Sequence, residues 1–372
     1  MRRMTAARRW ALVGLGVLLL VAAPFLVRAV PAHDDGTSAV ALLHRIQGSR
    51  DVAFSGYVES GGSVGLPAND VLSGLTKLVG DTNKVRVWWR DPTRWRVSTL
   101  RTTGETDLVR TGNRMLRWVY ESKNVTSVPD VAVRLPDTAD LLPNELARRA
   151  LSGARSGEVS RLPARRIAGR DALGLRLRPA DPQASIARVD VYADPATGLP
   201  VQVQLFGRGA RTPSVTSRFL DLSIGTPPSS ALAFSPPADA HLRSDDVVDL
   251  ADAANRFASR VPPKTLAGLP QRAVPVGQAR GAVGVYGRGP TLLLAVPLWH
   301  RSADRVREDL VRAPGTREID AGVLVAAPPL RLLLADAEPS GSAWLLAGTV
   351  TRTALVAAAE QLAAHRPGLS FR

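Results

Sequence analysis

The chain has 372 residues, 45% of them hydrophobic, which suits about two folded domains and excludes a disordered chain. It contains no cysteine, so disulfides, zinc–thiolate sites, a lipid-modified N-terminal cysteine and a cysteine nucleophile are excluded. The formal net charge is +15, but the basic residues are mostly dispersed arginines, so we expect no nucleic-acid partner. Attraction to an anionic membrane surface is the more natural consequence of this charge.

The N-terminus has the pattern of a targeting segment. Arginines among the first nine residues precede an uncharged run over 11–27. Positive charge before an apolar stretch holds the N-terminus in the cytoplasm and sends the rest of the chain across the membrane. The run is short for a spanning helix and long for a signal-peptide core, and Ala29 and Ala32 offer cleavage points. We therefore expect either a single-pass protein of the cytoplasmic membrane with its bulk outside, or a secreted one.

The next stretch changes its hydrophobic period. Apolar residues at helical spacing predict an amphipathic helix over 33–50, and a period of two then predicts a first strand over 52–58. The segment 61–82 begins with glycines and continues with apolar residues at helical spacing. It predicts a loop followed by a short helix, which would be either a lid or a long surface loop.

A series of hairpins begins at Lys84. Apolar and charged residues alternate over 84–90 and again over 94–97, with an Asp-Pro-Thr turn between them, and further strands extend to Tyr120. Such alternation predicts an antiparallel sheet with one buried and one wet face. Trp88 and Trp89 are adjacent and must therefore point to opposite faces of their strand.

The strands are interrupted once before they resume. Pro143 predicts the start of a helix that continues to Leu151. Residues 194–198 then have the composition of a hairpin turn. Alternating strands are expected on both sides of this turn, at 173–177, 189–191, 201–205 and 220–224.

A second module is expected after a proline-rich region. Prolines are frequent over 226–270, where one helix is predicted at 245–259, and this composition is typical of a linker. The module that follows has strands near 283–286, 291–296, 322–326, 330–334 and 342–347, and a helix over 351–364.

Several motifs occur in the order and spacing of a known family. These are KVRVWWRDPTRWRV at 84–97, GRDA at 169–172, VDVYADPATGLP at 189–200, FLDL at 219–222 and FSPP at 234–237. With them, residues 40–240 resemble the LolA/RseB (MucB) family of periplasmic lipoprotein carriers and sensors, and most of all its actinobacterial LolA-like branch. WLLAGT at 344–349, followed by a predicted helix, resembles the C-terminal domain of RseB-like regulators.

The resemblance implies an α+β fold with a strongly curved antiparallel half-barrel sheet capped by helices, a smaller C-terminal α+β module and an N-terminal hydrophobic anchor. The expected parts are the signal or anchor at 1–32, the half-barrel at 33–240, a linker with a helix at 241–261 and the C-terminal domain at 262–372. By resemblance, the cavity between sheet and helices takes acyl chains or a hydrophobic peptide. The side chains proposed to line it are Val87, Trp89, Trp95, Val97, Leu116, Trp118, Leu175, Val191 and Val203.

Motifs for catalysis are not found. Residues 61–65 match G-x-S-x-G, but that nucleophile needs a strand-to-helix turn and the surroundings predict an antiparallel sheet. The glycines at 284–289 have the wrong spacing for dinucleotide binding and predict a hairpin turn. The histidines lack partners at helical spacing, which argues against a metal site. From these motifs together we expect no metal, no cofactor and no catalytic residue.

Two functions follow from these observations. The first is a non-enzymatic, extracytoplasmic lipid-binding or lipoprotein-binding protein of the LolA-like type, tethered to the membrane, whose partner is a lipid or an acylated protein. The alternative is an RseB/MucB-like regulator of sigma-factor signalling, which would act by contact with a membrane anti-sigma factor. The additional C-terminal module favours this alternative over a simple carrier.

Overall fold

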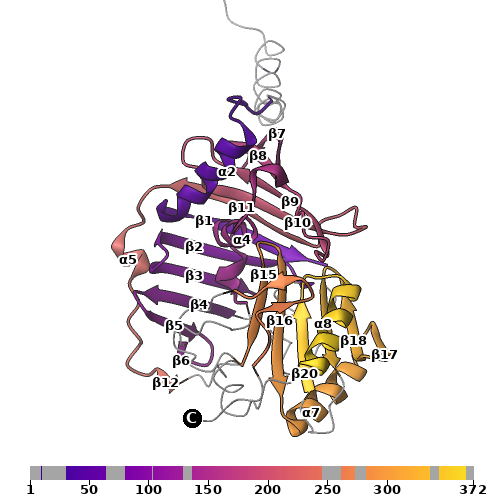
Figure 1. Ribbon diagram of the computed structural model, residues 1–372. Coiled ribbons are helices and arrows are strands. Elements are labelled where there is room, and N and C mark those ends of the chain that lie inside the picture. The colour runs from indigo at the N-terminus through magenta and orange to yellow at the C-terminus, as the bar shows by residue number, and fades with distance from the viewer. Residues whose placement is uncertain are drawn as a thin grey trace, which may run out of the picture.

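The computed structural model describes Trp10 and residues 31–63, 80–102, 104–128, 136–244, 261–272, 282–335 and 343–365. The hydrophobic run at 11–27, the predicted helix at 245–259 and most of the segment 61–82 lie outside the described residues. Within the described ranges, no helix is long and apolar enough to cross a membrane. The described strands form two large sheets that lie side by side and a small two-stranded sheet of β13 (Thr265–Leu266) and β14 (Leu269–Pro270) (Figure 1).

The larger sheet has twelve strands in the order β12-β6-β5-β4-β3-β2-β1-β11-β10-β9-β8-β7. Its strands are β1 Phe54–Gly62, β2 Asn83–Asp91, β3 Arg94–Arg101, β4 Gly104–Thr111, β5 Arg114–Val119, β6 Asn124–Val128, β7 Val159–Ile167, β8 Arg170–Leu177, β9 Ile186–Ala193, β10 Pro200–Gly207, β11 Val215–Ile224 and β12 His241–Ser244. All neighbours are antiparallel except β12, which runs parallel to β6. The sheet is open and almost entirely antiparallel. This confirms the predicted α+β class with an antiparallel sheet.

The predicted turn at 194–198 is confirmed, and its side chains explain it. The Asp194 carboxylate accepts hydrogen bonds from the backbone N–H groups of Ala196, at 3.1 Å, and Thr197, at 3.0 Å. Gly198 has a φ of 72°, which a residue without a Cβ adopts without strain. This local chemistry fixes the register in which β9 meets β10.

One face of the twelve-stranded sheet is covered by helices, and we call it the helix-covered face. Helix α2 (Ala39–Gly48) begins at Ser38, whose hydroxyl accepts the Ala41 N–H, and α4 (Pro143–Ala150) begins at a proline. Buried residues of both helices pack on the apolar residues of β8, β9 and β10. The short helix η2 (Thr138–Leu141) and Leu142, which follows it, pack on the strands from β1 to β4. The opposite face is called the outer face.

The second sheet has six antiparallel strands in the order β15-β16-β20-β19-β18-β17. Its strands are β15 Gly284–Arg288, β16 Thr291–Leu298, β17 Thr316–Ile319, β18 Gly322–Ala327, β19 Leu330–Ala335 and β20 Ala343–Gly348. Helix α8 (Arg352–Ala364) packs on one face and α7 (His300–Val311) on the other. All five strands predicted for this module and its last helix are confirmed, whereas α7 and β17 were not predicted.

The two sheets are joined by direct contacts as well as by the chain. The face under α7 also packs on Leu205 and Val215 of the larger sheet. Ala184 forms an isolated antiparallel bridge with Val350. The Arg288 guanidinium of β15 donates two hydrogen bonds of 2.7 Å to the carboxylate of Glu158, in the short helix η3 (Ser156–Glu158) before β7. The interface therefore combines apolar packing with a buried ion pair.

Candidate functional site

Seven of the nine predicted cavity residues lie together on the helix-covered face. They are Val87, Trp89, Trp95, Val97, Leu175, Val191 and Val203, and each is between 0% and 5% exposed. Phe54, Trp89 and Trp95 form a stack, with ring centroids 5.9 Å apart at both contacts and nearly parallel planes. Leu175, Val191 and Val203 are packed under α2 and α4. In the described structure these side chains are the hydrophobic core itself.

The other two predicted cavity residues, Leu116 and Trp118, lie on the outer face. The register pairs Trp118 with Asp107 and Leu116 with Val109, on the side of the sheet opposite to Val97 and Leu108. Met115 takes the buried position on the helix-covered face instead. The predicted alternation along β5 is confirmed. However, its apolar residues are distributed over both faces, so the pattern alone did not show which face the helices cover.

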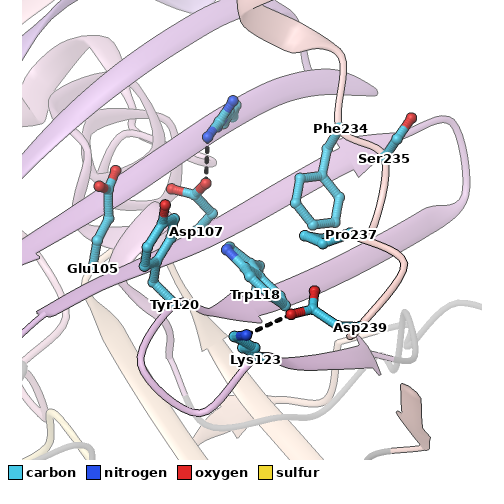
Figure 2. A pocket seen from close by; sticks show the side chains of 10 residues that line it. Glu105, Asp107, Trp118, Tyr120, Lys123, Phe234, Ser235, Pro237 and Asp239 are labelled. Carbon is cyan, nitrogen blue, oxygen red and sulfur yellow. Dashed lines mark hydrogen bonds and ion pairs between the residues drawn. The ribbon is translucent and has the colours of Figure 1, made fainter. Parts of the chain in front are cut away.

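A pocket of about 430 Å³ lies over Trp118 on this outer face (Figure 2). Strands β3, β4 and β5 form its floor, and the segment between β11 and β12 forms a wall. Its lining residues are Arg96, Glu105, Asp107, Trp118, Tyr120, Lys123, Phe234, Ser235, Pro237 and Asp239. We call it the outer-face pocket. It brings residues of one hairpin series together with a segment that comes much later in the chain.

Three aromatic rings meet in the outer-face pocket. The Trp118 ring centroid lies 6.1 Å from that of Tyr120, at an interplanar angle of 75°, and 6.0 Å from that of Phe234, at 45°. Trp118 is only 5% exposed, whereas Tyr120 is 65% exposed at the rim. Sequence reasoning singled out Trp118 and the FSPP motif containing Phe234, but not their contact.

Two ion pairs contribute four of the five charged side chains in the pocket. Asp107, which is 2% exposed, accepts hydrogen bonds from the Arg96 guanidinium and the Ser98 hydroxyl. Lys123 is paired with Asp239 at the rim, and this hydrogen bond lowers the pKa of the Asp239 carboxyl and raises that of the Lys123 ammonium. Figure 2 shows both pairs as dashed lines.

Glu105 is the fifth charged residue of the pocket. In the described ranges its carboxylate has no ion-pair partner. The Glu121 carboxylate accepts the Glu105 backbone N–H at 2.8 Å, so a second acidic group lies at the backbone of this residue, although Glu121 itself does not line the pocket. The lining therefore carries two cations and three carboxylates, a formal balance of −1.

The structure also shows the surroundings of the motifs considered for metal binding and catalysis. Among the described residues, no group of three or more His, Cys, Asp or Glu side chains is placed to hold a metal ion. Gly61 and Gly62 belong to antiparallel β1, and the Ser63 N–H bonds to the Ser214 carbonyl at 3.0 Å, so the G-x-S-x-G match begins in the wrong context for a nucleophile. Its last two residues lie outside the described ranges. The glycines at 284–289 form the predicted β15–β16 hairpin.

The sequence matches no family model and no curated protein. Among solved structures it is similar to the Pseudomonas aeruginosa MucA/MucB complex, with 18% identity and a TM-score of 0.47 over 86% of this chain and 96% of that one. A LolA superfamily protein from Nitrosomonas europaea shares 11% identity, with a TM-score of 0.25 over 54% of this chain and 99% of that one.

MucB and LolA-superfamily proteins are among the structural neighbours. A further crystal structure of MucB gives similar values, with 17% identity and a TM-score of 0.45 over 87% of this chain and 96% of that one. These are the two groups that the sequence resembles. At such identities the comparison with MucB concerns the fold and assigns no residue a role in this chain.

Proposed function

We propose that this chain is a non-catalytic binding protein that acts outside the cytoplasm and recognises a segment of a partner protein in the outer-face pocket. The observation that carries this proposal is the pocket of about 430 Å³, lined by three aromatic rings and five charged side chains. Its volume is in the range of ligand sites, about 300–1,000 Å³. A polypeptide offers both apolar and hydrogen-bonding groups, which match such a mixed lining.

A lipid or acylated protein is the second candidate, and the apolar helix-covered face is what favours it. However, the predicted cavity residues on that face are buried in packed cores beneath α2, α4 and η2. An acyl chain there would have to displace a helix from the sheet. In the outer-face pocket, a hydrocarbon chain would remove water from charged groups without replacing their hydrogen bonds. The partner-protein proposal requires neither cost.

The proposed location is supported by the sequence. Arginines precede the apolar run at 11–27, a pattern that sends the following chain across the cytoplasmic membrane. We include in the proposal that this run either tethers the protein to the membrane or is removed as a signal peptide. By the resemblance to RseB-like regulators, the candidate partner is the extracytoplasmic part of a membrane anti-sigma factor.

A photo-crosslinking residue at position 120 tests this function in the full chain, expressed in its native host. Tyr120 is exposed at the pocket rim, so we expect a covalent adduct with a polypeptide, identified by mass spectrometry of the purified adduct. The control carries the same residue in place of Leu220, an exposed position in β11 of the same sheet. A phospholipid adduct at position 120, or a stoichiometric lipid in an organic extract, would favour the second candidate. Equal adducts at both positions would contradict the pocket as the binding site.

A further inference from the structure

We infer that the outer-face pocket selects a basic side chain, lysine or arginine, of the partner segment, held between the three aromatic rings and the Glu105 carboxylate. This inference rests on the proposed function and names the chemistry of its ligand. It is carried by the arrangement of the rings, by the pairing of the charges and by the charge balance of the lining.

The rings provide a surface that attracts cations. Tyr120 and Phe234 flank Trp118 at centroid distances of 6.1 and 6.0 Å, and both rings are inclined to it. An aromatic face carries negative quadrupolar charge, and the attraction is strongest for tryptophan. Several rings around one spot attract ammonium and guanidinium groups more than they attract neutral groups of the same shape. Figure 2 shows these side chains around the same hollow.

The charges in the pocket also favour a ligand cation over a ligand carboxylate. Arg96 is engaged with Asp107, and its guanidinium also lies 5.7 Å from the centroid of the Trp88 ring. Lys123 is engaged with Asp239. A ligand carboxylate would therefore have to break an existing ion pair, while a ligand cation meets a Glu105 carboxylate that has no ion-pair partner in the described structure.

The charge balance of the pocket lining is opposite in sign to the net charge of the chain. The sequence as a whole has a formal net charge of +15, which repels cationic partners at long range. Yet the pocket lining has a balance of −1, and the Glu121 carboxylate, just outside the lining, is bound to the backbone N–H of Glu105. Opposite charges at short range outweigh the screened field of distant arginines at physiological salt. The pocket is thus an acidic and aromatic site on a basic protein.

The test is a titration of the full chain in detergent micelles, observed through the indole N–H signals of its tryptophans by NMR. The probes are the Nα-acetyl methylamides of lysine, arginine, norleucine and glutamate. The Trp118 signal is assigned with the variant Trp118→Phe. We expect the lysine or the arginine probe to shift this signal, with at least about fivefold tighter binding than norleucine, which has a similar apolar stem without the charge.

Two variants and one control complete the experiment. Glu105→Gln keeps the shape and removes the charge, so we expect it to weaken binding of the basic probe about fivefold and to leave norleucine unchanged. Phe234→Ala removes one ring and should weaken binding of the basic probe to a similar extent. Glu308→Gln, on the exposed surface of α7, serves as the control that should change neither. Unchanged indole signals elsewhere in the spectrum show that each variant is folded.

The outcomes separate this inference from the function on which it rests. Equal binding of lysine and norleucine probes, or full affinity in Glu105→Gln, would overturn the inference even if position 120 crosslinks to a polypeptide. Tighter binding of the glutamate probe would also overturn it. Conversely, a Glu105-dependent lysine or arginine shift without any polypeptide adduct would support the cation site and reject the partner-protein function.

Discussion

Replacing Trp89 with alanine is expected to lower the free energy of unfolding by about 4 kcal/mol, the usual cost of removing a fully buried large aromatic side chain. Trp89 is 2% exposed and lies between the rings of Phe54 and Trp95. Its removal would leave a cavity in the middle of the stack, which neighbouring strands cannot close without breaking their hydrogen bonds. Urea unfolding followed by far-ultraviolet circular dichroism measures the loss.

The adjacent tryptophan provides a matched control for this prediction. Trp88 points to the outer face, is half-buried and has the Arg96 guanidinium over its ring. Trp88→Ala should therefore cost about 1 kcal/mol, the size of a cation–π contact plus partial burial. If Trp88→Ala proved as costly as Trp89→Ala, the assignment of the two faces would be wrong. Trp89→Phe should recover most of the loss, since it keeps the stack and removes an indole N–H that has no hydrogen-bond partner in the described structure.

The second large effect is expected at the contact between the two sheets, for Glu158→Gln. The Glu158 side chain is 4% exposed and accepts two hydrogen bonds from Arg288, and others from the backbone N–H groups of Ala180 and Arg155. The Arg288 hydrogen bonds above all lower the pKa of Glu158 from 4.5 to about 2. A shift of this size corresponds to about 3 kcal/mol of stability, which the variant should lose at pH 7.

The pH dependence follows from the direction of this shift. Because the pKa is lower in the folded protein, the charged carboxylate stabilises the fold fully at pH values above 4.5. That contribution falls as the pH is lowered from 4.5 toward about 2, where Glu158 takes up a proton in the folded state as well. Calorimetry should show the transition temperatures of the wild-type chain and Glu158→Gln converging over this range. A constant difference between them would contradict the prediction.

An ion pair within one helix, more open to water than the Glu158–Arg288 pair, is the control. The Glu145 side chain is 14% exposed and accepts hydrogen bonds from Arg148 one turn later in α4, where Arg148 is half-exposed. Because water reaches the Arg148 side of the pair, and pairs at this helical spacing contribute only a few tenths of a kcal/mol, Glu145→Gln should change stability by less than about 1 kcal/mol. Comparing the two variants separates the effect of burial at the interface from the loss of a carboxylate as such.

The sequence predicted those parts of the fold in which local pattern and tertiary burial agree. The sequences of β2, β3, β8 and β10 alternate regularly, and the turns before β3 and β10 have their own side-chain chemistry. Strand β7 was not predicted, because Pro163 lies within it and its register shifts between Leu162 and Arg165. Helix α7 was missed because it is mostly polar and has no side-chain cap. Its burial depends on a sheet that local sequence does not reveal.

The site was less predictable than the fold. The aromatic residues were recognised as candidates, but their distribution between the two faces depends on which face the helices cover. The outer-face pocket also requires Phe234, which the chain brings to Trp118 only after β11 has joined the sheet. No local pattern encodes this contact. The FSPP motif supported the family resemblance, but it did not predict the contact of Phe234 with Trp118.

The position of β1 in the larger sheet has a consequence for how the chain folds. Strand β1 pairs with β2 on one side and with β11 on the other, so Phe54 lies opposite Ile224 in the middle of the sheet. The hairpins from β2 to β6 and from β7 to β10 join strands that are close in sequence. The pairing of β1 with β11, which we call the β1–β11 seam, requires the whole chain between these two strands to close into a loop. We expect this seam to form last, with Trp89 fluorescence reporting a slow refolding phase. Until then, each half of the sheet would expose an unpaired strand edge, the kind of surface that aggregates when a newly synthesised chain folds too slowly.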